Sequence, residues 1–367
     1  MTGAPRSIAA RRLAAQRIAR REHRDPAALV SWMGALQAQD PAAARWAVGM
    51  RLAGASPREA AIQRALDEGT IIRTHVMRWT WQLVAAADLH WMLPLIGPEV
   101  IRRAARRFRE LALDEATFRR SRGVLERALR DGAHRTRDEL GAALAAAGIA
   151  TEDGRRLSHL LGRAELEGII CSGATRGKAA TFALLAARAP RPAAAWPRER
   201  ALAELARRYF RSRGPATVAD FVWWSGLRPA EARAALESVR PELARDTLDG
   251  REAWRDREGA VAPRAALADA HLIPPFDELL IAYKDRGAVL DPQHATHMNA
   301  GGGMLPGAVV LGGRVVASWR RTLVRDEVAV QVRPFARIAA ADRAKIQRAA
   351  GRYARFLGRA ATVTFTA

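Results

Sequence analysis

The sequence has little cysteine, little lysine and no long hydrophobic runs. Cys171 is the only cysteine among 367 residues, so an internal disulfide and a cysteine-rich zinc site are both excluded. No apolar run approaches the roughly 18 residues of a membrane-spanning helix. The arginine-rich N-terminal stretch lacks the hydrophobic segment of a secretory signal. From these absences we expect a soluble, cytoplasmic protein.

Negative charge is also scarce relative to positive charge. Lys and Arg together number 60 against 38 Asp and Glu, a formal charge of +22, and the only lysines are Lys178, Lys284 and Lys345. A GC-rich genome explains the preference for arginine over lysine, but it does not explain the excess of positive charge. Such an excess indicates a polyanionic partner, with nucleic acid foremost and a simple solubility effect as the alternative. A membrane surface is disfavoured, because the charge is spread along the chain and no lipidation signal is visible.

The hydrophobic content is high enough for several cores. Hydrophobic residues make up 49% of the chain, which excludes disorder along its whole length. A chain of this length predicts roughly two to three domains.

The middle of the chain shows a recognisable order of elements. We expect a helix over 118–130, a second opened by the capping box at Thr136, and a third over 155–167. Two apolar strands follow, at 169–172 and 181–184, joined by a turn that carries Arg176 and Lys178. Three helices followed by a basic hairpin are the order of a winged helix, whose third helix enters a DNA groove.

This order recurs. Residues 199–262 and, less regularly, 7–90 repeat it, whereas after about residue 263 valine-rich alternation and the Gly312-Gly313 turn predict strands and a final helix at 340–357. We expect a mainly α fold with small β parts (α+β), in which tandem winged-helix units precede a C-terminal mixed β domain. The predicted boundaries are 1–95, 96–190, 197–262 and 263–367, with a Pro/Ala-rich linker at 189–197 and a mobile glycine tract at 301–303.

The usual catalytic signatures are missing. The sequence has no Walker-type loop, no G-x-S-x-G, no H-E-x-x-H and no paired-carboxylate motif. His294 and His297 are the only close histidine pair, and Pro292 and Asn299 argue against a helix there. We interpret them as polar surface histidines in a loop, with a metal site as the minor alternative, and we expect no metal or cofactor.

Tryptophans interleaved with arginines form the first suggestive cluster. Trp79 and Trp81 alternate with Arg78 and Gln82, and Trp223-Trp224 end a predicted helix. The segment 73–78 is predicted to be a strand, so Arg73, His75 and Met77 would share one face and Arg78 the other. Burial is the default for tryptophan, and stacking on a base is the functional alternative.

Two glutamines form the second cluster. On a regular helix Gln37 and Gln39 would lie about 200° apart and could not act together. Pro41 disfavours helical geometry at Asp40, and Asp40 is suited to cap the next helix. We therefore place both glutamines in a turn between helices, where both amides face one space; two ordinary surface glutamines are the alternative.

Four segments, taken in order, resemble the winged-helix DNA glycosylases of the AlkZ/YcaQ family. They are W-x-x-x-x-Q-A-Q-D (32–40), R-T-H-V-M-R-W-T-W-Q-L-V (73–84), W-S-G-L (224–227) and I-P-P-F-D-E-L-L-I-A-Y-K-D-R (273–286). The resemblance implies tandem winged helices and a C-terminal β domain, in agreement with the element pattern.

The resemblance also implies an activity. The family hydrolyses the N-glycosidic bond of alkylated purines and unhooks interstrand cross-links, with a catalytic Gln-x-Gln in one branch and Gln-x-Asp in the broader bacterial branch. Gln37 and Gln39 match the first branch, which is similar to self-resistance enzymes against DNA-alkylating natural products of the azinomycin type. No cofactor is implied.

The implied chemistry is within the reach of amides. Alkylation at N7 makes a guanine cationic and therefore a good leaving group, so the remaining task is to position water beside an oxocarbenium-like sugar. An amide carbonyl can accept from that water while its NH₂ holds a sugar or phosphate oxygen. The sequence suggests no nearby carboxylate except Asp40, which we assign to capping. A cross-linked base stays tethered to the other strand, which favours an open groove over a closed pocket.

The remaining expectations concern DNA. We expect Trp32, Arg73, His75, Arg78 and Trp79 to line the groove that receives the substrate. The residues expected to hold the duplex are Arg155, Arg156, His159, Arg163, Arg176, Lys178, Lys284 and Arg286. The expected partner is double-stranded DNA with alkylated or cross-linked purines, bound by a monomer associated with the nucleoid. The competing interpretation is a tandem winged-helix transcriptional regulator without catalysis, which shares the fold and charge but has no need of Gln-x-Gln.

Overall fold

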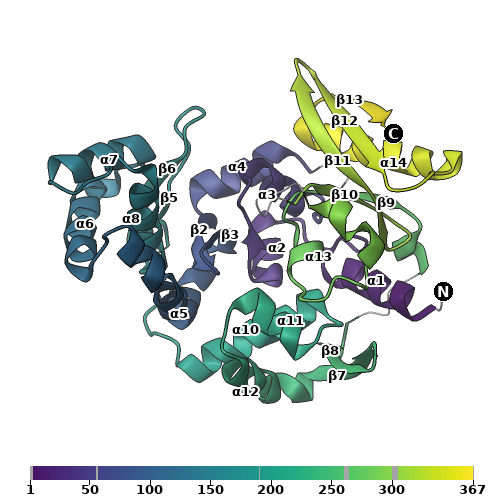
Figure 1. The fold of residues 1–367 in the computed structure, drawn as a ribbon, viewed down its shortest axis with the longest axis horizontal. Coiled ribbons are helices and arrows are strands. Elements are labelled where there is room, and N and C mark those ends of the chain that lie inside the picture. Colours follow the sequence, from purple (N-terminus) through teal and green to yellow (C-terminus); the bar gives the residue numbers. More distant parts are fainter. Residues whose placement is uncertain (1–2, 55–56, 190, 260–263, 300–304, 367) are drawn as a thin grey trace. The chain divides into compact units, whose positions relative to one another are not determined.

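The computed structural model describes residues 3–54, 57–189, 191–259, 264–299 and 305–366, and the chain forms an α+β fold (Figure 1). Its contacts divide it into two compact units, each assembled from separate stretches of sequence. Unit 1 comprises Met1–Gln63, Ala203–Trp224 and Arg228–Ala367, and unit 2 comprises Arg64–Leu202 and Ser225–Leu227. The sequence-based division into four consecutive domains is finer than this and stays a prediction.

The first part of unit 1 is helical. Proline at the first helical position opens three of its helices, as the sequence predicts. The elements are α1 (Gly3–Ala15), α2 (Pro26–Met33), β1 (Leu36–Gln37), α3 (Pro41–Gly49), the start of α4 (Glu59–Glu68), most of α10 (Arg198–Arg213), α11 (Val218–Ser225), α12 (Pro229–Val239), β7 (Leu243–Leu248) and β8 (Arg251–Asp256).

A five-stranded sheet forms the C-terminal part of unit 1, in the order β13-β12-β11-β10-β9. Only the β12–β13 pair is parallel. Leu311 pairs with Arg314 across Gly312-Gly313, both at positive φ, which confirms the predicted two-residue turn. The elements are β9 (Ala270–Ile273), α13 (Glu278–Ile281), β10 (Gly307–Leu311), β11 (Arg314–Val324), β12 (Glu327–Pro334), α14 (Ala340–Leu357) and β13 (Ala360–Phe365). The predicted mobile glycine tract lies outside the described residues.

Unit 2 is built from a hairpin, four principal helices and a small sheet. Its elements are β2 (Ile71–Met77), β3 (Thr80–Ala85), α5 (Leu89–Glu110), α6 (Glu115–Ala128), β4 (Arg135–Thr136), α7 (Arg137–Ala146), α8 (Gly154–Leu166), β5 (Ile170–Ser172), β6 (Thr181–Leu184) and α9 (Leu185–Arg188). Strands β4, β6 and β5 form the sheet in that order. Short 3-10 turns at 86–88, 130–132, 240–242, 264–267 and 292–298 complete the two units.

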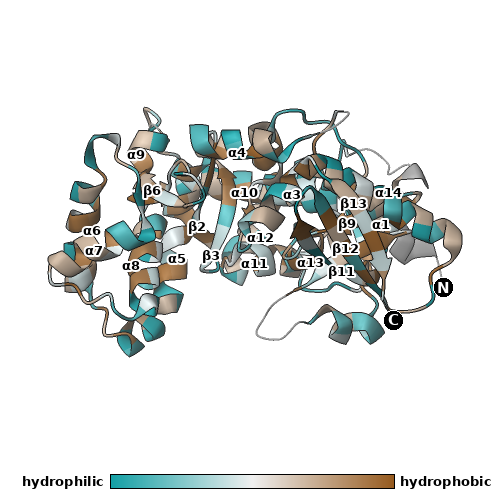
Figure 2. Cartoon of the chain, turned by 90° about the horizontal axis from the view of Figure 1, so that it is seen from above, coloured by the Kyte–Doolittle hydropathy of each residue, from teal (hydrophilic) through white to brown (hydrophobic). Residues whose placement is uncertain are grey.

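The order of three helices and two strands predicted for 118–184 is confirmed in unit 2. Thr136 and Glu139 form the predicted capping box at the start of α7. Helices α6, α7 and α8 each carry hydrophobic and hydrophilic residues (Figure 2), and Leu125, Leu140 and Leu160 are fully buried in their common core. Apolar faces turned toward one another therefore hold this part of the chain together. The winged-helix interpretation of the arrangement stays a prediction.

Two features of unit 2 before residue 111 differ from what the sequence indicates. The sequence did not indicate α5, a 22-residue helix with Pro94 and Pro98 inside it. The predicted strand over 73–78 ends at Met77, because Arg78 and Trp79 both take positive φ and form the two-residue turn between β2 and β3. That conformation normally selects glycine or asparagine, so the residue types gave no turn signal.

Candidate functional site

The segment with Gln37 and Gln39 is fixed at both ends. Helix α2 ends at Gly34, which lies at φ 72°, and the Asp40 carboxylate caps α3 by accepting from Ala42 N at 2.9 Å and Ala43 N at 3.0 Å. The predicted capping role of Asp40 is therefore confirmed.

Between these ends the chain is extended at Leu36 and Gln37 and bends at Gln39 and Asp40. Leu36 and Gln37 form β1, and Leu36 and Ala38 are buried whereas Gln37 is half-buried and Gln39 is exposed. The two glutamines are therefore the less buried residues of the segment 36–39. The predicted turn is thus corrected at Gln37, which lies in a strand, whereas Gln39 lies at a bend.

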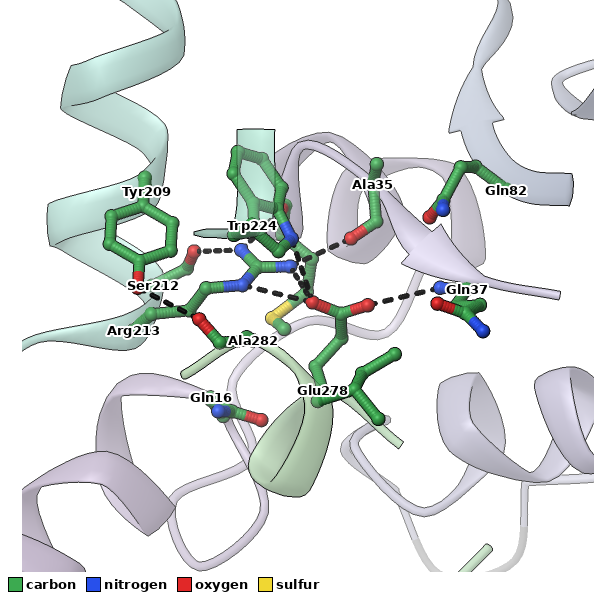
Figure 3. A network of polar contacts seen from close by, with 12 residues as sticks. Gln16, Ala35, Gln37, Gln82, Tyr209, Ser212, Arg213, Trp224, Glu278 and Ala282 are labelled. Carbon is green, nitrogen blue, oxygen red and sulfur yellow. Dashed lines mark hydrogen bonds and ion pairs between the residues drawn. The ribbon is translucent and has the colours of Figure 1, made fainter. Parts of the chain in front are cut away.

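A buried carboxylate lies beside the main chain of Gln37. Glu278, at the start of α13, is 1% exposed, and its Oε1 accepts from Gln37 N at 3.0 Å (Figure 3). Its Oε2 accepts from Trp224 Nε1 at 2.9 Å and from Arg213 Nη2 at 2.6 Å and Nε at 3.1 Å. All the hydrogen bonds to this carboxylate thus come from buried or main-chain donors, and Arg213 balances its charge.

Arg213 also holds the chain that leads into β1. Its Nη1 donates to Met33 O at 2.6 Å, its Nη2 donates to Ala35 O at 2.7 Å, and its guanidinium lies 4.3 Å from the centre of the Trp224 ring (Figure 3). One fully buried guanidinium therefore connects α10, the end of α2 and Glu278. This places the Gln37 main chain in a rigid setting.

The residues around Glu278 are anchored by a second buried ion pair. Asp277 caps α13 through Leu279 N and accepts from Arg51 Nη1 and Nη2, both at 2.7 Å. Arg51 Nη2 also donates to Gln16 Oε1 at 2.9 Å, and Gln16 Nε2 donates to Tyr283 Oη at 3.0 Å. The pKa of Tyr283 is raised, chiefly by burial.

Sequence reasoning missed Glu278, Arg213 and Arg51. The carboxylate nearest to Gln37 in the sequence is Asp40, whereas Glu278 is 241 residues away along the chain. A signal was present, because Glu278 lies in the I-P-P-F-D-E-L-L segment that carried the resemblance, and adjacent acidic residues in an apolar run require buried partners.

Trp32 lies in unit 1, at a cavity of about 710 Å³ lined by α1, α2, α10 and the β7–β8 hairpin. Its Nε1 donates to Ala15 O at 3.0 Å, and the guanidinium carbons of Arg17 and Arg211 lie 3.9 and 4.3 Å from its ring centre. The Trp32 ring therefore makes cation–π contacts with Arg17 and Arg211.

The other groove candidates belong to unit 2. His75 is buried and its Nδ1 lies 2.5 Å from Glu165 Oε2, while Trp79 packs on Phe108 and stacks on His159 at 5.3 Å. The Arg73 guanidinium covers Trp81 at 4.4 Å, and Arg78 lies in the hairpin turn. His75 is therefore part of a buried polar pair rather than an exposed groove residue.

The four candidates on α8 separate into two kinds. Arg155 is exposed and pairs with Asp153 at the helix start, and half-buried His159 lies one turn further along. Arg156 donates to the carbonyl oxygens of Ala112 at 3.2 Å and Leu111, and Arg163 is paired with Glu115 and Glu167 while only 11% exposed. The last two side chains therefore have structural partners.

The remaining basic candidates lie in loops. Arg176 pairs with Glu139 at 2.9 Å and Lys178 is exposed; both belong to the loop between β5 and β6 of unit 2. In unit 1 Lys284 is exposed, and its main-chain N donates to Asp220. Burial lowers the pKa of Arg286.

The prediction that the histidine pair lies in a loop is wrong. His294 and His297 lie on the 3-10 turn at 292–298, and their rings pack on Phe335 at 5.0 and 4.9 Å. Proline at the first position is compatible with such a turn, so Pro292 did not exclude it. In the part of the chain that the structure describes, no group of three or more His, Cys, Asp or Glu side chains is arranged to hold a metal ion. Among those same residues, no helix has the length and apolar character needed to cross a bilayer.

Comparison with known proteins identifies the family. No curated protein sequence matches the chain at a significant level. Among solved structures, Streptomyces sahachiroi DNA glycosylase AlkZ is similar to the chain, with 25% identity, a TM-score of 0.78 and full coverage of both chains. The family model described as "DNA glycosylase AlkZ-like" matches residues 30–356, which contain both glutamines, Arg213 and Glu278. The chain therefore belongs to the AlkZ-like DNA glycosylase family.

Proposed function

We propose that this DNA glycosylase hydrolyses the N-glycosidic bond of N7-alkylated purines in duplex DNA, including purines in interstrand cross-links, with Gln37 and Gln39 as its catalytic pair. One observation carries the assignment. The two glutamines are the less buried residues of the segment 36–39, and the buried Glu278 carboxylate holds the Gln37 main chain at 3.0 Å. A rigid main chain is what two neutral side chains need to hold a water molecule in one geometry.

The chemistry requires little proton transfer to the base. Breaking the C1′–N9 bond of an N7-alkylguanine returns the bonding electrons to a cationic ring, so the base leaves neutral while the sugar becomes oxocarbenium-like. A water held by the amide oxygens of Gln37 and Gln39 adds to C1′ and loses its proton to solvent. The product is an abasic site, and because the mechanism has no amine nucleophile, we propose a monofunctional enzyme that leaves the strand intact.

Glu278 has a positioning role in this proposal. Its Oε2 is surrounded by Arg213 and Trp224, and its Oε1 faces the Gln37 main chain. Both oxygens of the carboxylate are thus engaged by buried or main-chain donors of the protein. We assign to it the placement of Gln37.

The DNA-holding residues of the proposal come from both units. In unit 2, we propose that Arg73, Arg78 and Trp79 on the β2–β3 hairpin contact the substrate strand, with buried His75 supporting the hairpin through Glu165. The proposed phosphate contacts are exposed or half-buried residues of α8, the β5–β6 loop and the loop after α13, namely Arg155, His159, Arg176, Lys178, Lys284 and Arg286. We propose a structural role for Arg156 and Arg163 instead.

A biological role follows from the Gln-x-Gln pattern. We propose that the enzyme protects its host from a DNA-alkylating natural product of the azinomycin type, acting as a monomer on the nucleoid. Excision of the corresponding adduct should then be faster than excision of simple methylpurines.

The test uses duplexes with one N7-methylguanine or one N7 cross-link, labelled at one end. We expect strand breaks only after heating or alkali, and none with the Gln37→Ala/Gln39→Ala double variant. Gln293→Ala, which removes an exposed amide elsewhere, is the matched control and should retain full activity. Full excision by the double variant would refute the assignment of the pair. Tight binding without breaks on either duplex would instead favour the transcriptional regulator.

A further inference from the structure

The cavity beside Trp32 in unit 1 is rich in arginine. Seven arginines and four carboxylates line its volume of about 710 Å³, so positive charge is in excess. It lies among the C-terminal end of α1, α2, α10 and the β7–β8 hairpin. Neither Gln37 nor Gln39 lines it, so the cavity is distinct from the candidate catalytic pair.

The ion pairs within the cavity leave cations unbalanced. Glu22 is shared by Arg17 at 2.9 Å and Arg20 at 2.5 Å, and Glu242 is bound by Arg207 at 2.6 Å. Among the described residues Arg211 makes no ion pair.

Guanidinium donors of two described arginines at the cavity lack acceptors. Within the described part of the chain, the buried Nε atoms of Arg17 and Arg211 have no hydrogen-bond partner, whereas Arg255 Nε lies 3.5 Å from Asp246 Oδ2. Burial lowers the pKa of both Arg17 and Arg211, and the charge of neighbouring arginines lowers each pKa further. Buried N–H groups and uncompensated cations of this kind are stabilised by an anion that accepts from several of them at once.

The backbone conformation at Arg17 also supports an anion site in this cavity. Arg17 lies at φ 61°, just after α1, where Ile18 N and Ala19 N bond to Leu13 O in a helix-ending turn. Glycine is the usual residue at this left-handed position, because a side chain is strained there. The retained side chain instead places a guanidinium 3.9 Å from the Trp32 ring, where it also pairs with Glu22.

We propose that this cavity is a binding site for a phosphate group, with Arg17 and Arg211 as its principal ligands and Trp32 as the surface that orients them. Guanidinium forks match the geometry of phosphate oxygens, and the Trp32 ring lies against two of them in the cavity lining. Trp32 therefore acts here by placing cations and not by stacking on a base. The phosphate can come from the DNA backbone or from a free phosphate compound, and the two sources are separated by experiment. The inference does not depend on the chemistry of Gln37 and Gln39, because binding to undamaged DNA tests it.

The first arm measures fluorescence anisotropy of an undamaged labelled duplex over a series of salt concentrations. If a phosphodiester occupies the cavity, Arg211→Gln should weaken binding and reduce the slope of log affinity against log salt by about 0.9 for each DNA phosphate that the variant no longer neutralises. The second arm titrates inorganic phosphate into the protein by calorimetry. If a free phosphate is the ligand, Arg211→Gln should abolish the binding heat and leave the salt slope unchanged.

Two further variants keep the test decisive. Arg17→Gly should lose the same phosphate binding while its urea midpoint stays the same or rises, because glycine relieves the left-handed strain. Arg106→Gln on α5 removes an arginine that is 86% exposed and should change neither arm. The proposal is overturned if both Arg17→Gly and Arg211→Gln match the wild type in the salt slope and in the phosphate titration.

Discussion

Replacing Glu278 with glutamine removes the negative charge of one buried carboxylate and leaves the size and shape of the side chain nearly unchanged. The side chain is 1% exposed, and its Oε2 accepts from Trp224 and twice from Arg213. If the amide oxygen of the glutamine takes the place of Oε2, its NH₂ must face Gln37 N, and two donors then meet at a site where the native distance is 3.0 Å. The Arg213 guanidinium, which is fully buried, simultaneously loses its counter-charge.

The magnitude follows from these contacts. Removing one partner of a buried ion pair typically costs about 3–5 kcal/mol, and the unsatisfied Gln37 N–H contributes about 1–3 kcal/mol within that range. Since folded proteins have only about 5–15 kcal/mol of stability, Glu278→Gln should unfold at clearly lower urea yet remain folded in buffer at low temperature. Under those folded conditions we expect excision to be slowed, because the Gln37 main chain is displaced.

The assay follows urea unfolding by tryptophan fluorescence and excision well below the unfolding range. Glu110→Gln, which removes two ion pairs at the exposed end of α5, is the control and should show no measurable change. A Glu278→Gln variant within about 1 kcal/mol of the wild type, with the same excision rate, would refute the reasoning on the buried pair.

Three further outcomes follow from other parts of the fold. A Cβ on Gly97 would lie 2.6 Å from the Leu166 carbonyl oxygen, so Gly97→Ala should cost about 1–3 kcal/mol and lower the thermal midpoint. Gly123→Ala on α6, where a Cβ would lie 3.4 Å from the flexible Arg127 side chain, should be neutral or stabilising. Burial lowers the pKa of His271 from 6.5 to about 4, so the unfolded chain binds more protons and stability should fall as pH drops from 6.5 toward 4, by up to about 1.4 kcal/mol per unit. Urea unfolding at several pH values checks this, and His271→Leu should show a shallower slope. Burial raises the pKa of Cys171 to about 12, so a thiol reagent at pH 8 should react with it only after unfolding, and prompt reaction of the native protein would contradict this.

The sequence by itself determined most helix positions, because their end signals are local. Proline opens α12, the Thr136 hydroxyl caps α7, and α3 has both a proline and the Asp40 cap. The predicted final helix matches α14 at both ends. The alternation of hydrophobic and other residues is also a local signal, and it predicted strands where β10, β11 and β12 lie. The Gln-x-Gln pair was likewise visible in the sequence.

Only the tertiary structure decided what holds that pair in place. Strand β1 is two residues long and carries no periodic signal, so the sequence did not predict the extended conformation of Gln37. Glu278 and Arg213 are 65 residues apart and meet beneath a segment more than 170 residues distant from either, and no local pattern specifies such a contact. Burial of a charge is decided by what the whole chain packs around it. The sequence therefore indicated the two glutamines, whereas only the fold showed the Arg213–Glu278 ion pair that holds the Gln37 main chain.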